Sequence, residues 1–164
     1  MRTTLVILAS MALGGCGLHP LYGGGSAGPV AATLRSVSVG PIEGQAGWLV
    51  RNKLIDRLGQ QDGTAAYRLD VTLDDKITAF GLRSDRAATQ ERRALRARYQ
   101  LVDTRNGMVV LDSTAGSDAG IDIVSSEYAT VAAEQTALEN LADIVADQIT
   151  ARVALYASRT SPAK

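Results

Sequence analysis

The 164-residue chain contains one cysteine, one histidine, one tryptophan and one phenylalanine. A single cysteine excludes a disulfide within the chain, and so few aromatic residues require a core of aliphatic side chains. Net charge is also lacking, because 17 basic and 17 acidic residues give no general attraction to nucleic acid or to an anionic membrane surface. The apolar run at residues 5–13 is too short for a membrane-spanning helix, which needs about 20 residues.

The cysteine ends a sequence typical of bacterial lipoprotein leaders. Arg2 gives a basic start, an apolar segment follows, and small residues stand directly before the cysteine. The four residues at this point are Leu13-Gly14-Gly15-Cys16. We therefore expect residues 1–15 to be a removed signal peptide. A reactive thiol or half of a disulfide is the alternative interpretation, which the flanking glycines and the lack of a second cysteine disfavour.

Lipidation would give Cys16 a diacylglycerol and an N-acyl chain such as palmitate, and several acyl chains make membrane attachment effectively permanent. Gly17 follows the cysteine where many bacteria use aspartate to retain lipoproteins in the inner membrane. We expect a protein lipid-anchored at the periplasmic face of the outer membrane, with no other cofactor.

The chain then divides into a tether, one domain and a tail. Residues 16–33 are expected to be a flexible tether, because 23–28 read Gly-Gly-Gly-Ser-Ala-Gly and offer no side chain to bury. This stretch also fits a phosphate-binding G-x-G-x-x-G loop, but no strand precedes it and no helix follows. Residues 34–157 have the length of a single domain, and we expect residues 158–164 to be disordered.

Apolar periodicity predicts the elements of this domain. Residues with a period of two predict strands, and those with a period near 3.6 predict helices. The expected strands are 34–42, 67–80, 95–101 and 109–113, with a tight turn at Asn106-Gly107 before the last. The expected helices are 45–60, closed by Gly59 or Gly63, and a long one from Ser126 over about 30 residues.

The order of these elements is strand, helix, three strands, helix. We therefore predict an α+β fold in which a four-stranded mixed sheet is covered on one face by two helices. The uncovered face should carry Arg68, Asp70, Arg96 and Arg98.

Two groups of short motifs carry a resemblance to a known family. The first is Cys16-Gly17-Leu18-His19-Pro20-Leu21-Tyr22-Gly23. The second comprises Ser126-Glu127-Tyr128-Ala129, Ala132-Ala133-Glu134, Leu141-Ala142-Asp143, Gln148-Ile149 and Arg152. Together with the chain length and element order, they resemble the lipopolysaccharide-assembly lipoproteins of the LptE family.

This resemblance implies a two-helix, four-stranded domain that sits as a plug and assembly partner inside the outer-membrane barrel LptD, where the complex inserts lipopolysaccharide into the outer leaflet. A different class remains open: an auxiliary lipid-binding lipoprotein of an ABC-type lipid-trafficking system. The two are separated by which membrane protein copurifies with the chain.

Arginines are concentrated between residues 83 and 98, where six of them meet two acidic residues and give a net charge of +4. Guanidinium groups match phosphate oxygens in bidentate geometry, and lipopolysaccharide carries phosphates on lipid A and its inner core. The candidate lipopolysaccharide-binding residues are Arg92, Arg93, Arg96 and Arg98. The alternative interpretation is a solvated edge whose charges discourage aggregation.

Trp48 is a candidate partner-binding residue, since large aromatic side chains dominate interface energetics, although a lone tryptophan also suits a core.

No catalytic site is expected. His19 stands three residues after the expected anchor, where it cannot be oriented as a base, and Asp74 and Asp75 should point to opposite faces of a strand. No metal site is expected either, because the carboxylates in 112–122 fit no calcium-loop spacing.

Overall fold

The computed structural model describes residues 28–59, 64–82 and 88–160. The predictions for Cys16, His19 and the glycine-rich stretch up to residue 27 concern residues outside these ranges. The described elements, in chain order, are α2 (Pro29–Arg35), β1 (Val37–Val39), α3 (Gly44–Leu58), β2 (Tyr67–Leu82), β3 (Ala88–Asp103), β4 (Val109–Asp122) and α4 (Glu127–Thr160).

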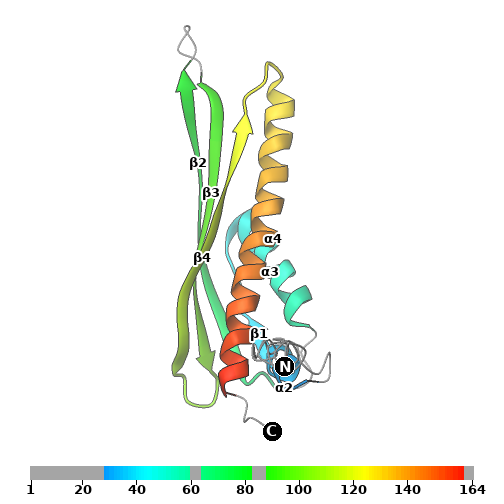
Figure 1. The fold of residues 1–164 in the computed structure, drawn as a ribbon, viewed down its shortest axis with the longest axis vertical. Helices are drawn as coiled ribbons and strands as arrows, with labels where there is room; N and C mark the ends of the chain where they lie inside the picture. Colours follow the sequence, from blue (N-terminus) through cyan, green and yellow to red (C-terminus); the bar gives the residue numbers. More distant parts are fainter. Residues whose placement is uncertain (1–27, 60–63, 83–87, 161–164) are drawn as a thin grey trace, which may run out of the picture.

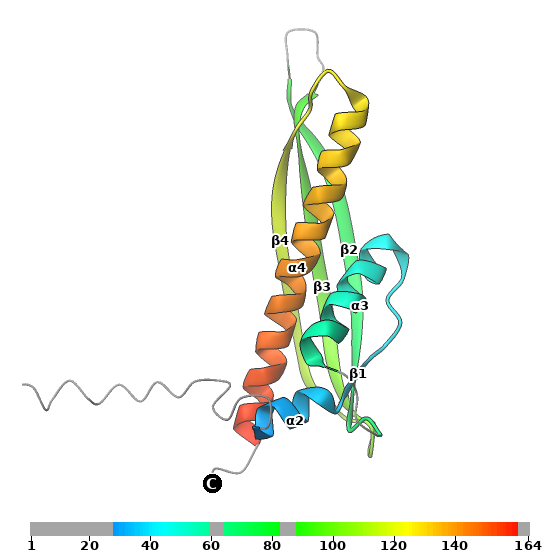
Figure 2. The ribbon, with the colours of Figure 1, turned by 90° about the vertical axis from the view of Figure 1, so that its right-hand side faces the viewer.

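The four strands form one mixed sheet in the order β1-β2-β3-β4. The short strand β1 is parallel to β2, and the other neighbours are antiparallel. Figures 1 and 2 show a long twisted sheet with α3 and α4 on one side, and α2 lying across one end. The prediction of an α+β fold with two helices on one face of a four-stranded mixed sheet is confirmed, and α2 is an additional helix.

Helices α3 and α4 run parallel and are joined by charged side chains along their contact. Lys53 Nζ lies 2.7 Å from Asp143 Oδ2, and Arg57 bonds both Asp143 and Asp147. The apolar stripes of both helices face the sheet, where the fully buried side chains include Leu54, Leu69, Leu95, Tyr99, Leu101, Leu138, Leu141 and Ile149. As the composition requires, nearly all of these are aliphatic.

The predicted turns and caps are also present. Gly107, with φ of 70°, closes the β3–β4 hairpin after Asn106, whose side chain accepts the N–H of Met108. Gly59, with φ of 87°, ends α3, and its N–H bonds the carbonyl of Ile55. Positive φ is the conformation that glycine adopts without steric cost, so both positions are read directly from the sequence.

The amino-terminal boundary of the domain differs from the prediction. Residues 29–33 were expected to be tether and 34–42 a strand, whereas Pro29 starts α2, Leu34 is buried in it, and the strand has only three residues. Proline is well suited to the first turn of a helix, and Pro41 lacks the N–H that a longer strand β1 would need. The tail was expected from residue 158, but α4 continues to Thr160.

The strands after β1 are longer than periodicity predicts. Strand β3 starts at Ala88 instead of residue 95, and β4 continues to Asp122 instead of ending at 113. The added residues are polar and charged, but they pair with each other in a regular antiparallel register from Gln90↔Asp122 to Arg98↔Thr114. Backbone pairing and cross-strand ion pairs replace apolar alternation here.

These additions make the molecule long and divide it into two halves. We call residues 74–82, 88–95 and 117–134 the tip half, which is the upper end in Figure 1, and the remaining described residues the base half. Helix α3 begins beside Gln135, since Gln45 bonds that side chain, so it covers only the base half. Among the tip-half residues whose burial the structure describes, three are buried: Leu95, Ile121 and Thr130.

Candidate functional site

The candidate arginines divide between the two faces of the sheet. Strand side chains alternate, so Arg92, Arg96 and Arg98 share the face away from the helices, which we call the open face, while Arg93 points toward α4. The structure therefore brings together three of the four predicted residues and separates the fourth.

Arg93 connects strands β2 and β3 of the sheet to helix α4. Its guanidinium donates to both carboxylate oxygens of Asp75, at 2.9 and 2.6 Å, and to the carbonyl oxygen of Glu134 on α4 at 2.9 Å. Only 12% of its side chain is exposed. These contacts engage all three guanidinium nitrogens with acceptors of the protein, so Arg93 stabilises the tip half instead of offering a free cation.

Carboxylates from β4 accompany the arginines of the open face. Arg96 Nη2 lies 2.7 Å from Asp118 Oδ2, and Arg98 Nη2 lies 3.0 Å from Asp112 Oδ2. The hydrogen bond from Arg98, and a further one from Gln100, lower the pKa of the Asp112 carboxyl below its ordinary value. Any anion bound at Arg96 or Arg98 must compete with these two carboxylates.

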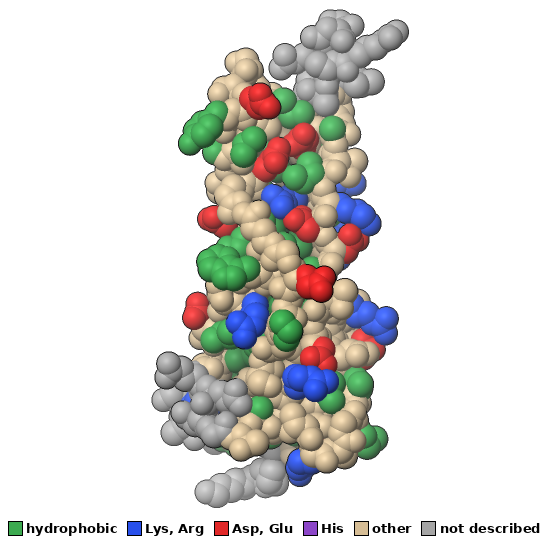
Figure 3. All heavy atoms as spheres, turned by 180° about the vertical axis from the view of Figure 1, so that it is seen from behind, with side chains coloured by type: hydrophobic (Ala, Val, Ile, Leu, Met, Phe, Trp, Pro, Cys, Tyr) green, Lys and Arg blue, Asp and Glu red, His purple; other side chains and the backbone are tan. Residues whose placement is uncertain are grey.

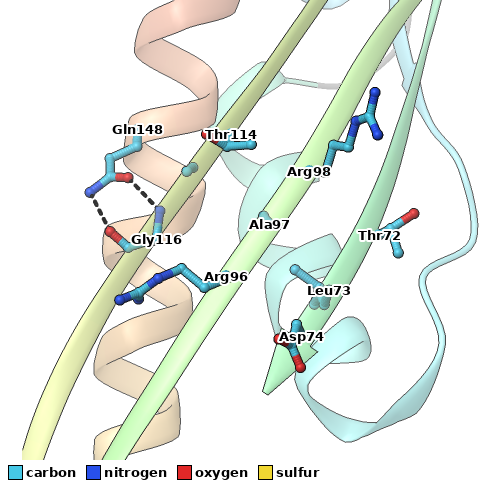
Figure 4. Close-up of a pocket in the computed structure, with 10 residues that line it drawn as sticks. Thr72, Leu73, Asp74, Arg96, Ala97, Arg98, Thr114, Gly116 and Gln148 are labelled. Carbon is cyan, nitrogen blue, oxygen red and sulfur yellow. Dashed lines mark hydrogen bonds between the residues drawn. The ribbon is translucent and has the colours of Figure 1, made fainter. Parts of the chain in front are cut away.

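A hollow of about 630 Å³ lies on the open face between these pairs (Figure 4). Its lining includes Thr72, Asp74, Arg96, Arg98 and Thr114, so polar side chains from three strands converge on it. The hollow combines hydroxyl groups with guanidinium groups, which is the donor set that binds phosphate and sugar oxygens.

Gly116 shapes this hollow and the adjoining sheet edge. A Cβ at this position would lie 2.5 Å from Arg96 Cδ and 2.9 Å from the Leu95 carbonyl oxygen, so glycine lets Arg96 lie across β4 and donate to Ser117 O. Gln148 of α4 accepts from the Gly116 N–H and donates to its carbonyl, as the dashed lines in Figure 4 show.

Arg92 differs from its neighbours because no carboxylate within the described part of the chain pairs with it. Its strand neighbours on the open face are Thr78 and Gly120. On the open face Arg96 and Arg98 are paired with Asp118 and Asp112, and on the side of the molecule opposite to the view of Figure 1 positive and negative side chains are also interspersed (Figure 3). The sequence window with a charge of +4 is thus not a uniformly basic surface.

Trp48 lies on α3 and 63% of its surface is exposed. The core interpretation of this residue is therefore wrong. Helical geometry explains it: Val50, Leu54 and Leu58 form the buried stripe, and residues two apart on a helix lie on nearly opposite sides. The large exposed side chain is available for contact with a partner.

Sequence analysis missed a carboxyl pair in the tip half. Glu91 of β3 lies close to Glu134 of α4, and its Oε2 atom is buried without a hydrogen-bond partner. Burial first, and Glu134 second, raise the pKa of the Glu91 carboxyl above its ordinary value. The pair was not visible in the sequence because β3 was expected to start only at residue 95.

The other carboxylates are spread along the sheet. Asp74 bonds Lys76 on the open face, whereas Asp75 bonds Arg93 on the helix side, which confirms that the two adjacent residues point in opposite directions. In 28–59, 64–82 and 88–160, no three histidine, cysteine or acidic side chains gather as metal ligands. No helix in these ranges combines the length and the apolar character that a bilayer crossing requires.

Three solved structures with a similar fold are described as bacterial lipoproteins. A protein from Caulobacter crescentus classed as a lipoprotein is 28% identical, with a TM-score of 0.70, covering 83% of this chain and 100% of its own. A minor lipoprotein from Acinetobacter baumannii is 16% identical, with a TM-score of 0.60 and coverage of 78% and 95%. The rare lipoprotein B from Shewanella oneidensis is 11% identical, with a TM-score of 0.59 and coverage of 75% and 96%. None of the curated proteins matches the chain.

The fold thus defines a small α+β lipoprotein domain. Residues 34–153 match the LptE family, described as lipopolysaccharide-assembly, and this range spans β1 to α4. The chain belongs to the LptE family and is a lipopolysaccharide-assembly lipoprotein.

Proposed function

We propose that this chain is anchored through lipidated Cys16 at the periplasmic face of the outer membrane, where it is the plug and assembly subunit of the LptD barrel. The observation that carries the proposal is the family match, which covers almost the whole described domain. We further propose that the protein is not an enzyme and acts by binding its barrel and lipopolysaccharide.

The shape of the domain supports a role inside a larger protein. Helix α4 has 34 residues, which corresponds to a length of about 50 Å, and the described sheet and helices lie along it in a narrow body (Figure 2). The tether would join at α2, at the base end, so an anchored molecule could extend its tip half away from the point of attachment.

The exposed face of α3 supports direct contact with a partner. Trp48 is 63% exposed, and Ile144 of the adjoining α4 is 40% exposed. Large apolar side chains on a polar surface are typical anchors of protein interfaces. A plug enclosed by a barrel would cover such side chains.

Copurification tests the barrel assignment. The full chain carrying a carboxy-terminal tag should bring down the outer-membrane barrel from a detergent extract, and depletion of the chain should lower the amount of folded barrel. Trp48→Ala should reduce recovery, with Glu139→Ala on exposed α4 as a matched surface control. Recovery of an inner-membrane transporter in place of a barrel, or normal barrel levels after depletion, would contradict the proposal.

Lipopolysaccharide binding is proposed for the open face through Arg92, Arg96 and Arg98. If the β4 carboxylates compete with phosphate, Arg96→Gln with Arg98→Gln should weaken binding, and Asp112→Asn with Asp118→Asn should strengthen it. Each guanidinium that loses or gains a phosphate should change affinity by roughly tenfold. The measurement is titration of the purified protein with lipopolysaccharide, and equal affinities in all variants would reject this site.

A further inference from the structure

One long edge of the sheet is left unpaired. Strand β1 pairs with β2 only from Val37↔Tyr67 to Val39↔Leu69, and β2 then continues for 13 more residues to Leu82. The last bond between them runs from the Gly40 N–H to the Leu69 carbonyl at 2.9 Å. Pro41 follows and has no N–H with which to extend the pairing.

The chain after β1 is held by α3 and stays apart from this edge. Arg51 of α3 donates to the carbonyl oxygen of Gly40. A Cβ at Gly47 would lie 2.6 Å from the Ile42 carbonyl oxygen, so the loop packs tightly on the helix. A hollow of about 370 Å³ separates this loop from Val71 and Leu73 at the β2 edge.

The unpaired groups lie on the odd-numbered residues of β2. Tyr67 donates its N–H to Ser36, and Leu69 accepts from Gly40, so odd residues direct their backbone toward the β1 side and even residues bond β3. Nothing in the described part of the chain bonds the outward groups that follow. They belong to Val71, Leu73, Asp75, Ile77 and Ala79, and together they span about 30 Å of strand.

The side chains along this edge favour an apolar neighbour. Ile77 faces the helix side with 43% of its surface exposed, because α3 does not extend to this level. On α4, Val131 continues the stripe of buried Leu138 but is 56% exposed for the same reason. Charges that usually protect an edge are neutralised here, since Asp75 is paired with Arg93 and Lys76 with Asp74.

We propose that the β2 edge from Val71 to Ala79 binds an extended segment of another polypeptide, which adds a fifth strand beside β2 where β1 leaves the sheet. A line of alternating free N–H and C=O groups is complementary only to another extended backbone. Ile77 and Val131 select a segment with apolar side chains at every second position, facing the helix side. This inference goes beyond the proposed function and does not require the partner to be a barrel.

The test uses the isotope-labelled full-length protein and a synthetic peptide of alternating threonine and valine, with amide hydrogen exchange measured by NMR. At ten times the Kd of the peptide, the amides of Asp75, Ile77 and Ala79 should exchange about tenfold more slowly. The amides of Lys76 and Thr78, which already bond β3, should not change. An absence of slowing at the three outward amides would overturn the proposal.

Two N-methylated peptides separate backbone pairing from simple apolar contact. One carries methyl groups on the valine amides and the other on the threonine amides, so each blocks one edge of the peptide strand and leaves its side chains intact. Exactly one of them should lose binding, and which one does so reports whether the added strand is antiparallel or parallel. Equal binding of both would overturn the proposal.

A variant pair tests the protein side. Ile77→Pro removes one outward N–H, a change that edge strands tolerate, whereas Ile77→Val retains it. The proline variant should lose the peptide-induced protection at Asp75 and Ala79, and the valine variant should keep it. If the protein alone sediments as a dimer with these three amides already protected, the occupant is a second copy and the proposal is wrong.

Discussion

The base half and the tip half of this protein are built from the same strands and the same helix, yet they are stabilised differently. In the base half, α3 and α4 together cover the sheet, and aliphatic side chains such as Leu54 and Leu141 are fully buried. In the tip half, α4 alone covers β3 and β4, and Arg93 and a carboxyl pair connect helix and sheet. Apolar burial therefore stabilises the base half. Polar contacts stabilise the tip half, where one edge of the sheet is unpaired.

The largest expected difference between the halves concerns apolar truncation. Leu54→Ala should lower the free energy of unfolding by about 2–5 kcal/mol, because it leaves a cavity under α3. Ile77→Ala in the tip half should lower it by less than about 1 kcal/mol, because the side chain is partly exposed. Urea unfolding of both variants measures the contrast, and similar losses would show that the tip half is as tightly packed as the base half.

For polar side chains of β3 the order should be the opposite: truncation in the tip half, at Arg93, should lower the free energy of unfolding more than truncation at Arg96. Arg93→Met should lower the free energy of unfolding by about 1.5–3 kcal/mol, because Asp75 and the Glu134 carbonyl lose a charged donor. Arg96→Met, its matched control on the exposed open face, should lower it by less than about 1 kcal/mol. Thermal unfolding of the two variants at low and high salt provides the measurement. A larger loss of stability for Arg96→Met would contradict the role of Arg93 in joining the sheet to α4.

The smallest expected effect is a difference in pH dependence between the halves. Burial and Glu134 raise the pKa of Glu91, so its contribution to stability is present below the ordinary value of 4.5 and is lost as pH rises through the raised value. Glu91→Gln should therefore become more stable than the unaltered protein as pH increases toward neutrality.

Asp143 in the base half should behave in the opposite way. Lys53, and then Arg57, lower its pKa, so its contribution is present above the ordinary value of 3.8 and is lost as pH falls through the lowered one. Asp143→Asn should be most destabilising at neutral pH and least in acid. Urea unfolding between about pH 3 and pH 8 compares the two variants, and parallel curves would remove the distinction between the halves.

Outside the segment before α3, where α2 and the short β1 differ from the prediction, sequence patterns predicted the base half well because burial imposes periodicity there. Strict alternation identified Tyr67 to Leu73, the helical period identified α3 and α4, and Gly59 and Gly107 marked two chain reversals. In the tip half the same patterns identified β2 and α4 but missed the added residues of β3 and β4. Residues 88–94 and 114–122 contain few apolar side chains apart from alanine and Ile121, so their alternation is weak and their strand structure depends on pairing between distant segments.

The candidate site was predicted only in part for a related reason. A count of arginines gives charge along the chain, but whether that charge is free depends on strand register. Register places Asp118 and Asp112 beside Arg96 and Arg98, and strand parity turns Arg93 to the other face. The exposure of Trp48 was recoverable from the sequence, because its helical angle already separates it from Val50 and Leu54.

The two hydrogen bonds between the Gln148 side chain and the Gly116 backbone limit how further strands can add to the sheet. A β-sheet with two accessible edges can template endless stacking of strands, which is the basis of fibril growth. Here a side-chain amide occupies the backbone of Gly116 on the outer edge of β4, so that side cannot propagate a ladder past this point. An extended chain that associates with β2 therefore cannot be matched on the opposite side by a strand that pairs with Gly116, because Gln148 already bonds its N–H and its C=O.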